Sequence, residues 1–376
     1  MTRMILAAAV ALSLFAGAGV SSAASTEPTV AVSLGDSFIA GEGGRWLGNT
    51  TYDWGDRRGT DRAAVARRWY WRYIEETVYA DTYATGCHRS DVAPILAADL
   101  AVDITINLAC SGARTVHVRS SANGGQSYRG EPPQADQLAA VAAHHDVEVV
   151  VVSVGGNDLG FTDVIIDCVA GYLTSTRWAP NTCHEDQDAK LTAALPRAMA
   201  DVAAVLADLR NILDSNGDSA ARIILQSYPS PVVEATNVRF AETGWDRTAR
   251  GGCPFWDADL EWANGSLIPR ITAGLRAVAE AEGAEFLDLS AALKGHEACA
   301  ASAQHGTGND GVSAEWIRFV TTGLTQGDVE ESLHPNAYGQ LAIGRCIALA
   351  IKSDPAPDLC LNSPGASPHS MRLEPG

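Results

Sequence analysis

Basic residues are scarce in this sequence. Its 376 residues include 27 Lys and Arg against 45 Asp and Glu, so the formal net charge is -18 at pH 7. A surface of that sign repels the phosphates of nucleic acids and the anionic headgroups of membranes. The composition therefore argues against nucleic-acid binding and disfavours anionic phospholipid membranes as partners. The chain is nevertheless 46% hydrophobic and can bury a large core.

Long hydrophobic runs are also few. One follows Arg3 at the start of the chain, runs from Met4 to Phe15, and gives way to small residues that end at Ala24. It is too short to cross about 30 Å of hydrocarbon, and no later segment approaches the roughly 20 apolar residues of a membrane helix. The pattern predicts a signal peptide over residues 1–24. We expect a soluble, secreted, extracellular protein with no stable membrane anchor.

No two cysteines form a C-x-x-C pair, the short spacing typical of zinc sites, so we expect no metal. An even number of cysteines in an exported chain favours disulfides. Eight cysteines permit about a hundred sets of pairs. We expect pairing in sequence order, which would close short loops, and we expect Cys168–Cys183 above all. The eight are Cys87, Cys110, Cys168, Cys183, Cys253, Cys299, Cys346 and Cys360.

Apolar runs that indicate buried strands alternate with helical patterns along the whole chain, and no internal repeat is visible. Strands are expected at 29–34, 102–108, 147–154, 222–226 and 284–287. Helices are expected at 92–100, 134–144, 186–213 with an interruption at Pro196, 260–282 and 338–351. Such alternation implies parallel strands joined by right-handed crossovers. We predict a three-layer α/β/α sandwich with a five-stranded parallel sheet, forming a single domain over 25–360. A disordered tail, rich in Pro, Ser and Gly, would follow at 361–376.

Two insertions depart from this minimal pattern. The first, 46–73, ends in an aromatic and basic cluster that would either cover the substrate or, as we favour, form a helix. In that helix Val65, Trp69 and Tyr73 would pack on the sheet at i, i+4 spacing while the arginines stay solvated. The second insertion, 235–255, carries Arg239, Trp245 and Arg247, which we expect at the rim of a cleft.

Four turns after the predicted strands carry reactive or glycine residues. Ligands of open α/β sheets bind outside the carboxyl ends of the strands, where these turns meet. The turns are Gly-Asp-Ser ending at Ser37, Cys-Ser-Gly ending at Gly112, Gly-Gly-Asn-Asp around Asn157, and Ser-Leu-His-Pro-Asn around His334. A serine hydroxyl needs an adjacent base to attack an acyl carbon, and His334 can supply it to Ser37. The resulting oxyanion needs donors, which we assign to the N–H groups of Ser37 and Gly112 and the amide of Asn157.

In this order the four residues resemble the SGNH, or GDSL-type, esterase and lipase family, and most closely its secreted actinobacterial members. The resemblance covers 30–346 and implies a flavodoxin-like fold and catalysis without a cofactor. It also implies the disulfides Cys87–Cys110, Cys168–Cys183 and Cys253–Cys299, with Cys346–Cys360 as an additional one. The sequence has no G-x-S-x-G nucleophile motif, which argues against the α/β-hydrolase fold.

The third member of the triad departs from the family pattern. The family has Asp three residues before the histidine, where this chain has Glu331. Glu331 could orient the imidazole, but some secreted relatives use a backbone carbonyl two residues before the histidine, which is that of Ser332 here. We favour Ser332, because Glu331 lies in an acidic run that could be solvated surface. We expect Asp36 and Asp158 to hold their tight turns by bonding nearby N–H groups.

The leading hypothesis is a secreted serine ester hydrolase, a lipase or carboxylesterase, which acts as a monomer on a small-molecule or lipid ester. Phospholipase and carbohydrate deacetylase use the same residues, so the substrate stays open. A catalytically silent binding protein is the contrasting hypothesis, but Ser37, Asn157 and His334 are all present. A metal-dependent phosphoesterase needs clustered ligands, and His144, His145 and Asp146 do not have a convincing spacing.

Overall fold

The central sheet contains the five strands that the sequence predicts. The computed structural model describes residues 27–49, 60–68, 70–306, 310–321, 327–353, 358–363 and 365–376. The strands are β1 (Thr29–Gly35), β4 (Ile104–Asn107), β5 (Asp146–Ser153), β6 (Arg222–Gln226) and β7 (Glu285–Leu287). All are parallel, in the order β4-β1-β5-β6-β7. Residues 149–152 of β5 are at most 2% exposed, as β-branched residues of a central strand should be.

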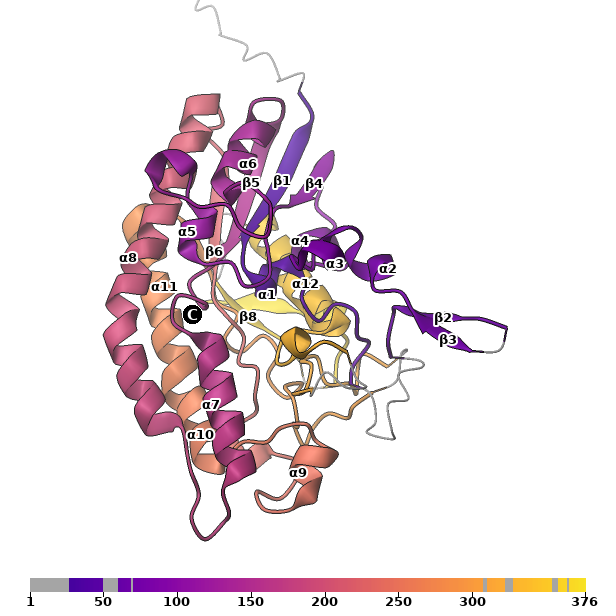
Figure 1. Ribbon diagram of the computed structural model, residues 1–376. Helices are drawn as coiled ribbons and strands as arrows, with labels where there is room; N and C mark the ends of the chain where they lie inside the picture. The colour runs from indigo at the N-terminus through magenta and orange to yellow at the C-terminus, as the bar shows by residue number, and fades with distance from the viewer. Residues whose placement is uncertain are drawn as a thin grey trace, which may run out of the picture.

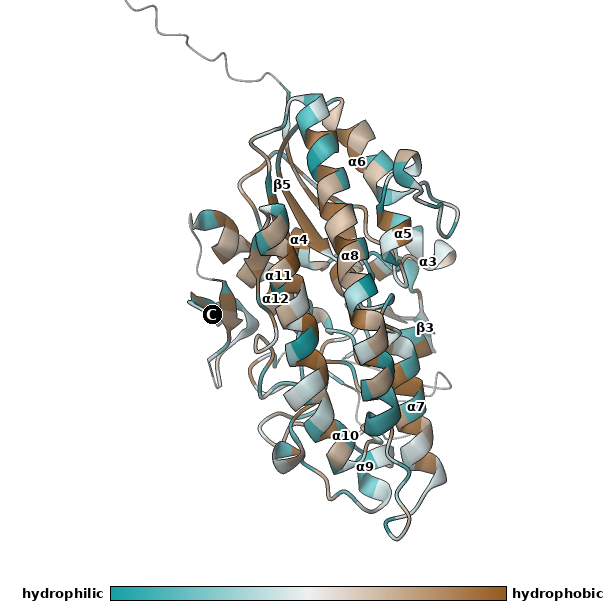
Figure 2. Ribbon diagram, turned by 90° about the vertical axis from the view of Figure 1, so that its left-hand side faces the viewer, coloured by the Kyte–Doolittle hydropathy of each residue, from teal (hydrophilic) through white to brown (hydrophobic). Residues whose placement is uncertain are grey.

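Helices cover both faces of this sheet. On one face lie α6 (Gln134–Ala142), α8 (His184–Asn216) and α11 (Ile268–Glu282), and on the other α4 (Pro94–Ala97) packs against α12 (Ala337–Lys352) (Figure 1). Figure 2 shows hydrophilic residues mixed with hydrophobic ones along α8 and α11, and a hydrophobic strand β5 behind them. The predicted three-layer α/β/α sandwich with a flavodoxin-like strand order is therefore confirmed.

Several helices differ from the predicted ones. The stretch around Pro196 is one uninterrupted helix, α8, in which the proline forgoes a single backbone hydrogen bond. The 260–282 pattern is divided into α10 (Asp257–Trp262), a π-helical turn (Ala263–Leu267) and α11. The sequence analysis missed α7 (Phe161–Thr174), which follows the Asn157 turn.

The short elements lie in the connections and near the C-terminus. They are α1 (Ser37–Ala40), α2 (Glu76–Tyr79), α3 (Thr82–Thr85), α5 (Thr115–Val118), α9 (Trp245–Ala249), and 3₁₀ turns at Ser121–Asn123, Ala235–Asn237, Val329–Glu331 and Pro368–Ser370. In the part of the chain that the structure describes, no helix combines the length and apolar character that crossing a bilayer requires.

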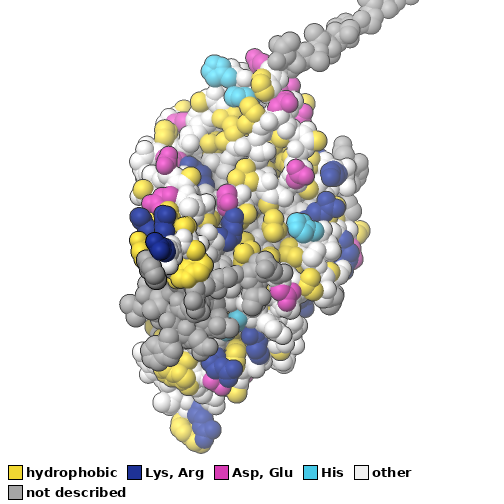
Figure 3. Space-filling model, turned by 90° about the vertical axis from the view of Figure 1, so that its right-hand side faces the viewer, with side chains coloured by type: hydrophobic (Ala, Val, Ile, Leu, Met, Phe, Trp, Pro, Cys, Tyr) yellow, Lys and Arg dark blue, Asp and Glu magenta, His cyan; other side chains and the backbone are white. Residues whose placement is uncertain are grey.

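The expected helix through Val65 and Tyr73 is wrong. These residues belong to an antiparallel hairpin, β2 (Ala64–Ala66) and β3 (Trp71–Tyr73), and Trp69 lies outside the described residues. β-Branched and aromatic residues favour extended backbone, which explains the hairpin. Its Trp71 side chain is not packed on the central sheet but is 43% exposed. The hairpin projects from the body of the molecule (Figure 1). On this side basic and hydrophobic side chains lie next to one another at the surface (Figure 3).

Two arginines of the second insertion bind it to other segments of the chain. Arg239 forms an ion pair with Glu315 at 2.6 Å, and Arg247 pairs with Asp257 at 2.7 Å. Trp245, in α9, is 79% exposed.

The tail is ordered, so the expected disorder of 361–376 is wrong where the structure describes it. β8 (Leu359–Leu361) pairs with β9 (Arg372–Glu374), and Met371 is buried. A disulfide from Cys360 to α12 anchors this hairpin, which a reading of composition alone does not detect. The predicted signal peptide, residues 1–24, lies outside the described residues.

The structure joins all eight cysteines in pairs of sequence order. The four disulfides are Cys87–Cys110, Cys168–Cys183, Cys253–Cys299 and Cys346–Cys360.

Candidate active site

Ser37 lies immediately beyond the carboxyl end of β1, beside β5. The sheet order changes direction at this point, which is where ligands bind in doubly wound sheets. Asp36 caps α1 by accepting a hydrogen bond from the N–H of Phe38 at 3.1 Å, and its own N–H donates to the Ser153 carbonyl. Gly35 has φ +134°, and a Cβ there would lie 1.8 Å from the Ser153 oxygen, so only glycine fits. The Gly-Asp-Ser turn is thereby seated against β5.

Gln134 secures the same turn from α6. Its side-chain oxygen accepts from the N–H of Gly35 at 2.6 Å, and its amide donates to the Gly35 carbonyl at 2.9 Å. The sequence analysis missed this residue, because nothing in the local pattern shows that a buried glutamine faces a turn 99 residues away.

His334 faces Ser37. Its Nε2 lies 2.7 Å from Oγ of Ser37, within hydrogen-bond distance. The histidine sits just before α12, whose first turn is capped by Asn336, with the side-chain oxygen accepting from Tyr338 N–H and Gly339 N–H. The same Asn336 donates to the Glu315 carbonyl at 2.7 Å, which fixes the loop that carries His334.

The other ring nitrogen of His334 faces the backbone. Nδ1 lies 3.1 Å from the Ser332 carbonyl oxygen. The intervening Leu333 is buried with φ +58°, a conformation that costs a non-glycine residue free energy and that turns the Ser332 carbonyl back toward the ring. Of the two groups considered for the third member, the Ser332 carbonyl is the one within hydrogen-bond distance of His334 Nδ1.

Glu331 points elsewhere. Its carboxylate accepts from Trp46 Nε1 at 2.7 Å, from the Tyr79 hydroxyl at 2.9 Å and from the N–H of Asp328 at 3.2 Å. The expectation that this acidic run is solvated is wrong for Glu331, which is 0% exposed. Burial raises the pKa of Glu331 to about 7 despite the nearby Arg45.

The imidazole of His334 is held in its neutral form. Burial lowers its pKa below 6.5, and the nearby charge of Glu42 opposes that shift only in part. The ring of Phe38 packs against it, with the two ring centres 4.9 Å apart. A neutral imidazole with Nε2 at a serine hydroxyl can accept that serine's proton.

The three N–H donors expected to bind the oxyanion belong to Ser37, Gly112 and Asn157. In the part of the chain that the structure describes, neither Ser37 N–H nor Gly112 N–H donates to another protein group. Asn157 Nδ2 donates to the Ala113 carbonyl at 2.9 Å, which orients the amide and leaves its second N–H for another acceptor. Gly112 has φ +81°, and a Cβ there would meet the Tyr128 hydroxyl at 2.6 Å, so this turn also requires glycine.

Two carboxylates tie the turns together; Asp36 also holds its own turn as expected, whereas Asp158 bonds a residue of another turn. Asp158 accepts from the N–H and hydroxyl of Thr115 at 3.0 and 2.7 Å. Asp36 accepts from the Tyr228 hydroxyl at 2.5 Å, and that hydroxyl in turn accepts from Gly156 N–H at 3.0 Å. Burial raises the pKa of Asp36 to about 7. The Ser37 and Asn157 turns are thus linked through Tyr228, which the sequence analysis did not single out.

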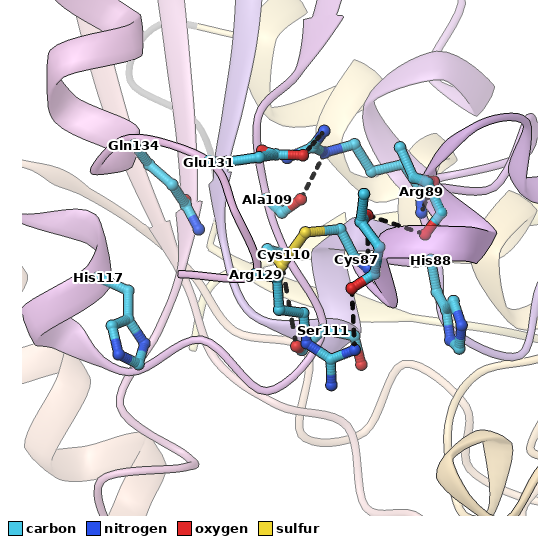
Figure 4. The surroundings of a disulfide bond; sticks show 12 residues. Cys87, His88, Arg89, Ala109, Cys110, Ser111, His117, Arg129, Glu131 and Gln134 are labelled. Atoms are coloured by element: carbon cyan, nitrogen blue, oxygen red, sulfur yellow. Dashed lines mark hydrogen bonds and ion pairs between the residues drawn. A yellow bond between two sulfur atoms is a disulfide. The ribbon is translucent and has the colours of Figure 1, made fainter. Parts of the chain in front are cut away.

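The Gly112 turn is braced from the other side by the Cys87–Cys110 disulfide (Figure 4). Ser111 N–H donates to the Cys87 carbonyl at 3.0 Å. Arg89 donates to the carbonyls of Leu108 and Ala109 and also pairs with Glu131. The backbone before Gly112 therefore has little freedom.

Comparison with known proteins agrees with this geometry. The model of the GDSL-like lipase/acylhydrolase family matches residues 33–342, which include all four turns. The chain belongs to this family. It is a carboxylic ester hydrolase with the GDSL-type fold. No curated protein matches the chain significantly.

Solved structures of ester hydrolases resemble the chain in part. The extracellular lipase of Streptomyces rimosus is 22% identical over 86% of this chain and 100% of its own, with a TM-score of 0.47. An aryl esterase of M. smegmatis and a carbohydrate acetylesterase of Sinorhizobium meliloti are each 12% identical, with TM-scores of 0.33 and 0.34. Each covers 86% of this chain and 98% of its own length.

A small apolar cavity of this hydrolase has the chain neighbour of His334 in its wall. Its volume is about 40 Å³. Leu333, which precedes His334, and Phe161, whose ring centre is 6.4 Å from that of Phe38, form part of its wall. α7, α10, the π-helical turn, residues 231–232 and Phe255 supply the rest of the lining, so residues from α7 and from the second insertion meet here.

Within the described ranges, one group of three possible metal ligands comes close enough to share an ion, namely Cys168, Cys183 and Asp259. The two cysteines are joined in a disulfide, and Asp259 accepts from the N–H groups of Cys183 and His184. The two sulfur atoms and Oδ1 of Asp259 are therefore engaged in bonds within the protein.

Proposed function

We propose that this protein is a secreted serine esterase that cleaves short-chain acyl esters through Ser37 and His334. The observation that carries the proposal is the 2.7 Å contact between His334 Nε2 and Ser37 Oγ, with Nδ1 engaged by the Ser332 carbonyl. A carbonyl at Nδ1 keeps the proton on that nitrogen, which leaves Nε2 free to act as the base.

Ser37 Oγ attacks the acyl carbon while its proton passes to His334 Nε2. The carbonyl electron pair moves to oxygen, and the oxyanion is bound by the N–H groups of Ser37 and Gly112 and by Asn157. When the intermediate collapses, the ester C–O bond breaks and the leaving alkoxide takes the proton from His334. Water then repeats these steps on the acyl-serine and releases the acid.

The cavity beside Leu333 and Phe161 supports an apolar and short acyl group. Its lining is almost entirely apolar, so a charged or hydroxylated acyl group would lose hydrogen bonds to water without replacement. The cavity volume of about 40 Å³ is little more than the roughly 30 Å³ that one molecule occupies in liquid water. The cavity therefore has room for only a few carbon atoms of an acyl group.

Secretion is supported by two independent features. The first residues have the basic, apolar and small-residue order of an export signal. The four disulfides fit an oxidising compartment and would be unusual in the cytosol.

The test is hydrolysis of p-nitrophenyl esters from acetate to palmitate by the oxidised protein and by its Ser37→Ala and His334→Ala variants. We expect turnover that peaks at short acyl chains and is lost in both variants, which should keep the circular dichroism and melting temperature of the wild type. Near-normal turnover in either folded variant would refute the roles of these residues. An optimum at palmitate would refute the assignment of the small cavity to the acyl group.

A further inference from the structure

Glu42 lies at the junction of three segments of the site. Its N–H donates to the Ser37 carbonyl at 3.1 Å, so it directly follows the turn of the nucleophile. The hydroxyl of Ser111, the residue before Gly112, contributes to lowering the pKa of its carboxyl group. The adjoining Gly43 packs on the base, because a Cβ on it would lie 3.3 Å from His334 Cβ. The side chain of Glu42 is 0% exposed.

The partner of Glu42 is His88. Nδ1 of His88 lies 2.9 and 2.8 Å from the two carboxylate oxygens, and the imidazole is stacked on the ring of Tyr79 at 5.0 Å between ring centres. Burial disfavours the charged form of both groups. The hydrogen bond and charge of the partner, together with other nearby charges, outweigh this effect, so the pKa of Glu42 is lowered and the pKa of His88 is raised. Both shifts favour the ionised pair, and the negative charge of Glu42 influences His334 more strongly than the positive charge of His88 does.

We propose that Glu42, paired with His88, is a positioning residue of ester hydrolysis that supplies His334 with the negative charge a triad carboxylate would otherwise provide. The proposal rests on the function proposed above. Ser332 offers His334 Nδ1 only a neutral carbonyl. Attack by Ser37 leaves an imidazolium, and a buried carboxylate nearby stabilises that cation more strongly than solvent would.

The other charged groups around His334 are already engaged. Glu331, on the same loop, bonds Trp46 and Tyr79 and faces Arg45 and Arg318. Asp328 lies near Arg45, at 3.8 Å. Asp36 bonds Tyr228 and has a pKa of about 7. Glu42 is the strongest influence that favours the charged imidazole, and His88 opposes it more weakly.

The experiment titrates the imidazole of His334 by NMR in the full-length oxidised protein, with the resonance assigned from the His334→Gln spectrum. In Glu42→Gln we expect the pKa of His334 to fall by about one unit, since a nearby carboxylate shifts a titrating group by this order. Glu331→Gln is the matched control, because it neutralises an equally buried carboxylate that does not face the ring. Its His334 should titrate as in the wild type, and Glu42→Asp, which keeps the charge, should move the pKa back toward the wild-type value.

Kinetics supply the second measurement. In Glu42→Gln the acid limb of kcat/KM should move to lower pH with the NMR pKa, and kcat should fall about tenfold while KM changes little, because a weaker base accepts the serine proton less readily. An unchanged pKa in folded Glu42→Gln, or an equal shift in Glu331→Gln, overturns the proposal. The NMR result does not depend on turnover, so loss of serine-dependent hydrolysis in the wild type would refute the proposed function separately.

Discussion

His334 Nε2 lies 2.7 Å from Oγ of Ser37, a residue 297 positions earlier in the chain. The two meet because β1 ends beside β5 at the centre of the sheet while α12 begins at the same edge. Both groups are attached to structure that cannot easily move: Ser37 to the capped turn after β1, and His334 to a loop whose Leu333 is held at φ +58°.

The pH dependence of turnover follows from this contact. Since burial lowers the pKa of His334 below 6.5, the base is neutral at all higher pH values. We therefore expect kcat/KM to rise with pH through a single acid limb whose midpoint lies below 6.5, measured with an uncharged ester. A midpoint above 6.5 would mean that the imidazole is stabilised as a cation in the free enzyme.

Replacing Glu331 by Gln separates a structural from a triad role. Because its carboxylate bonds Trp46 and Tyr79 rather than His334, we expect kcat to fall less than about tenfold, against about 10⁴-fold for a triad carboxylate. An amide cannot accept from three buried donors as a carboxylate does, so urea unfolding should show a loss of about 1–3 kcal/mol. A severe loss of kcat without loss of stability would instead make Glu331 part of the triad.

Asn157→Ala tests the oxyanion donors. Removing one such donor costs about 10²–10³-fold in kcat, and KM should change little because the charge develops only during attack. Asn123→Ala is the control, since that amide bonds Asp208 instead. Equal kinetics for the two variants would remove Asn157 from the proposed set of donors.

Glu297 should make the protein less stable as the pH rises. Burial raises its pKa from 4.5 to about 7, so the folded state retains a proton that the unfolded state has lost. The stabilisation is complete below pH 4.5 and is lost as the pH rises through about 7, an effect of about 3 kcal/mol at most. In the wild type, the urea midpoint should rise when the buffer is changed from alkaline to mildly acidic. This rise should be smaller in Glu297→Gln but unchanged in Glu280→Gln, whose position is exposed. The same slope in wild type and Glu297→Gln would assign the pH dependence to other groups.

The disulfides should differ in their effect on catalysis. Replacing Cys346 and Cys360 by Ser releases the tail hairpin and should cost about 2–4 kcal/mol of stability, with kcat within about twofold of the wild type. Replacing Cys87 and Cys110 frees the turn that precedes Gly112, and small displacements of reacting groups cost about 100-fold. Melting curves and ester hydrolysis on both double variants test this contrast. Equal activity in the two would show that the Gly112 turn needs no covalent brace.

The sequence alone was sufficient to predict the sheet and the four turns. Each strand coincides with a local apolar run, rich in β-branched residues in every strand but β7. Alternation with helices restricts the topology to a parallel sheet whose carboxyl ends share one edge. The turns carrying Ser37, Gly112, Asn157 and His334 could be located for that reason. Elements without such a local signal were missed or misassigned, among them α7 and the hairpin around Val65.

Tertiary structure alone decided which groups support these residues. The left-handed backbone of Leu333 decides whether the Ser332 carbonyl or the Glu331 side chain contacts His334. No residue type in that stretch predicts this backbone conformation. Gln134 on Gly35, and Glu42 beside His88, are contacts between segments 99 and 46 positions apart. The local sequence pattern shows whether a side chain is apolar or polar. A buried polar group needs a hydrogen-bond partner, because burial without one is too costly in free energy. Which group becomes that partner depends on how elements distant in the sequence pack together.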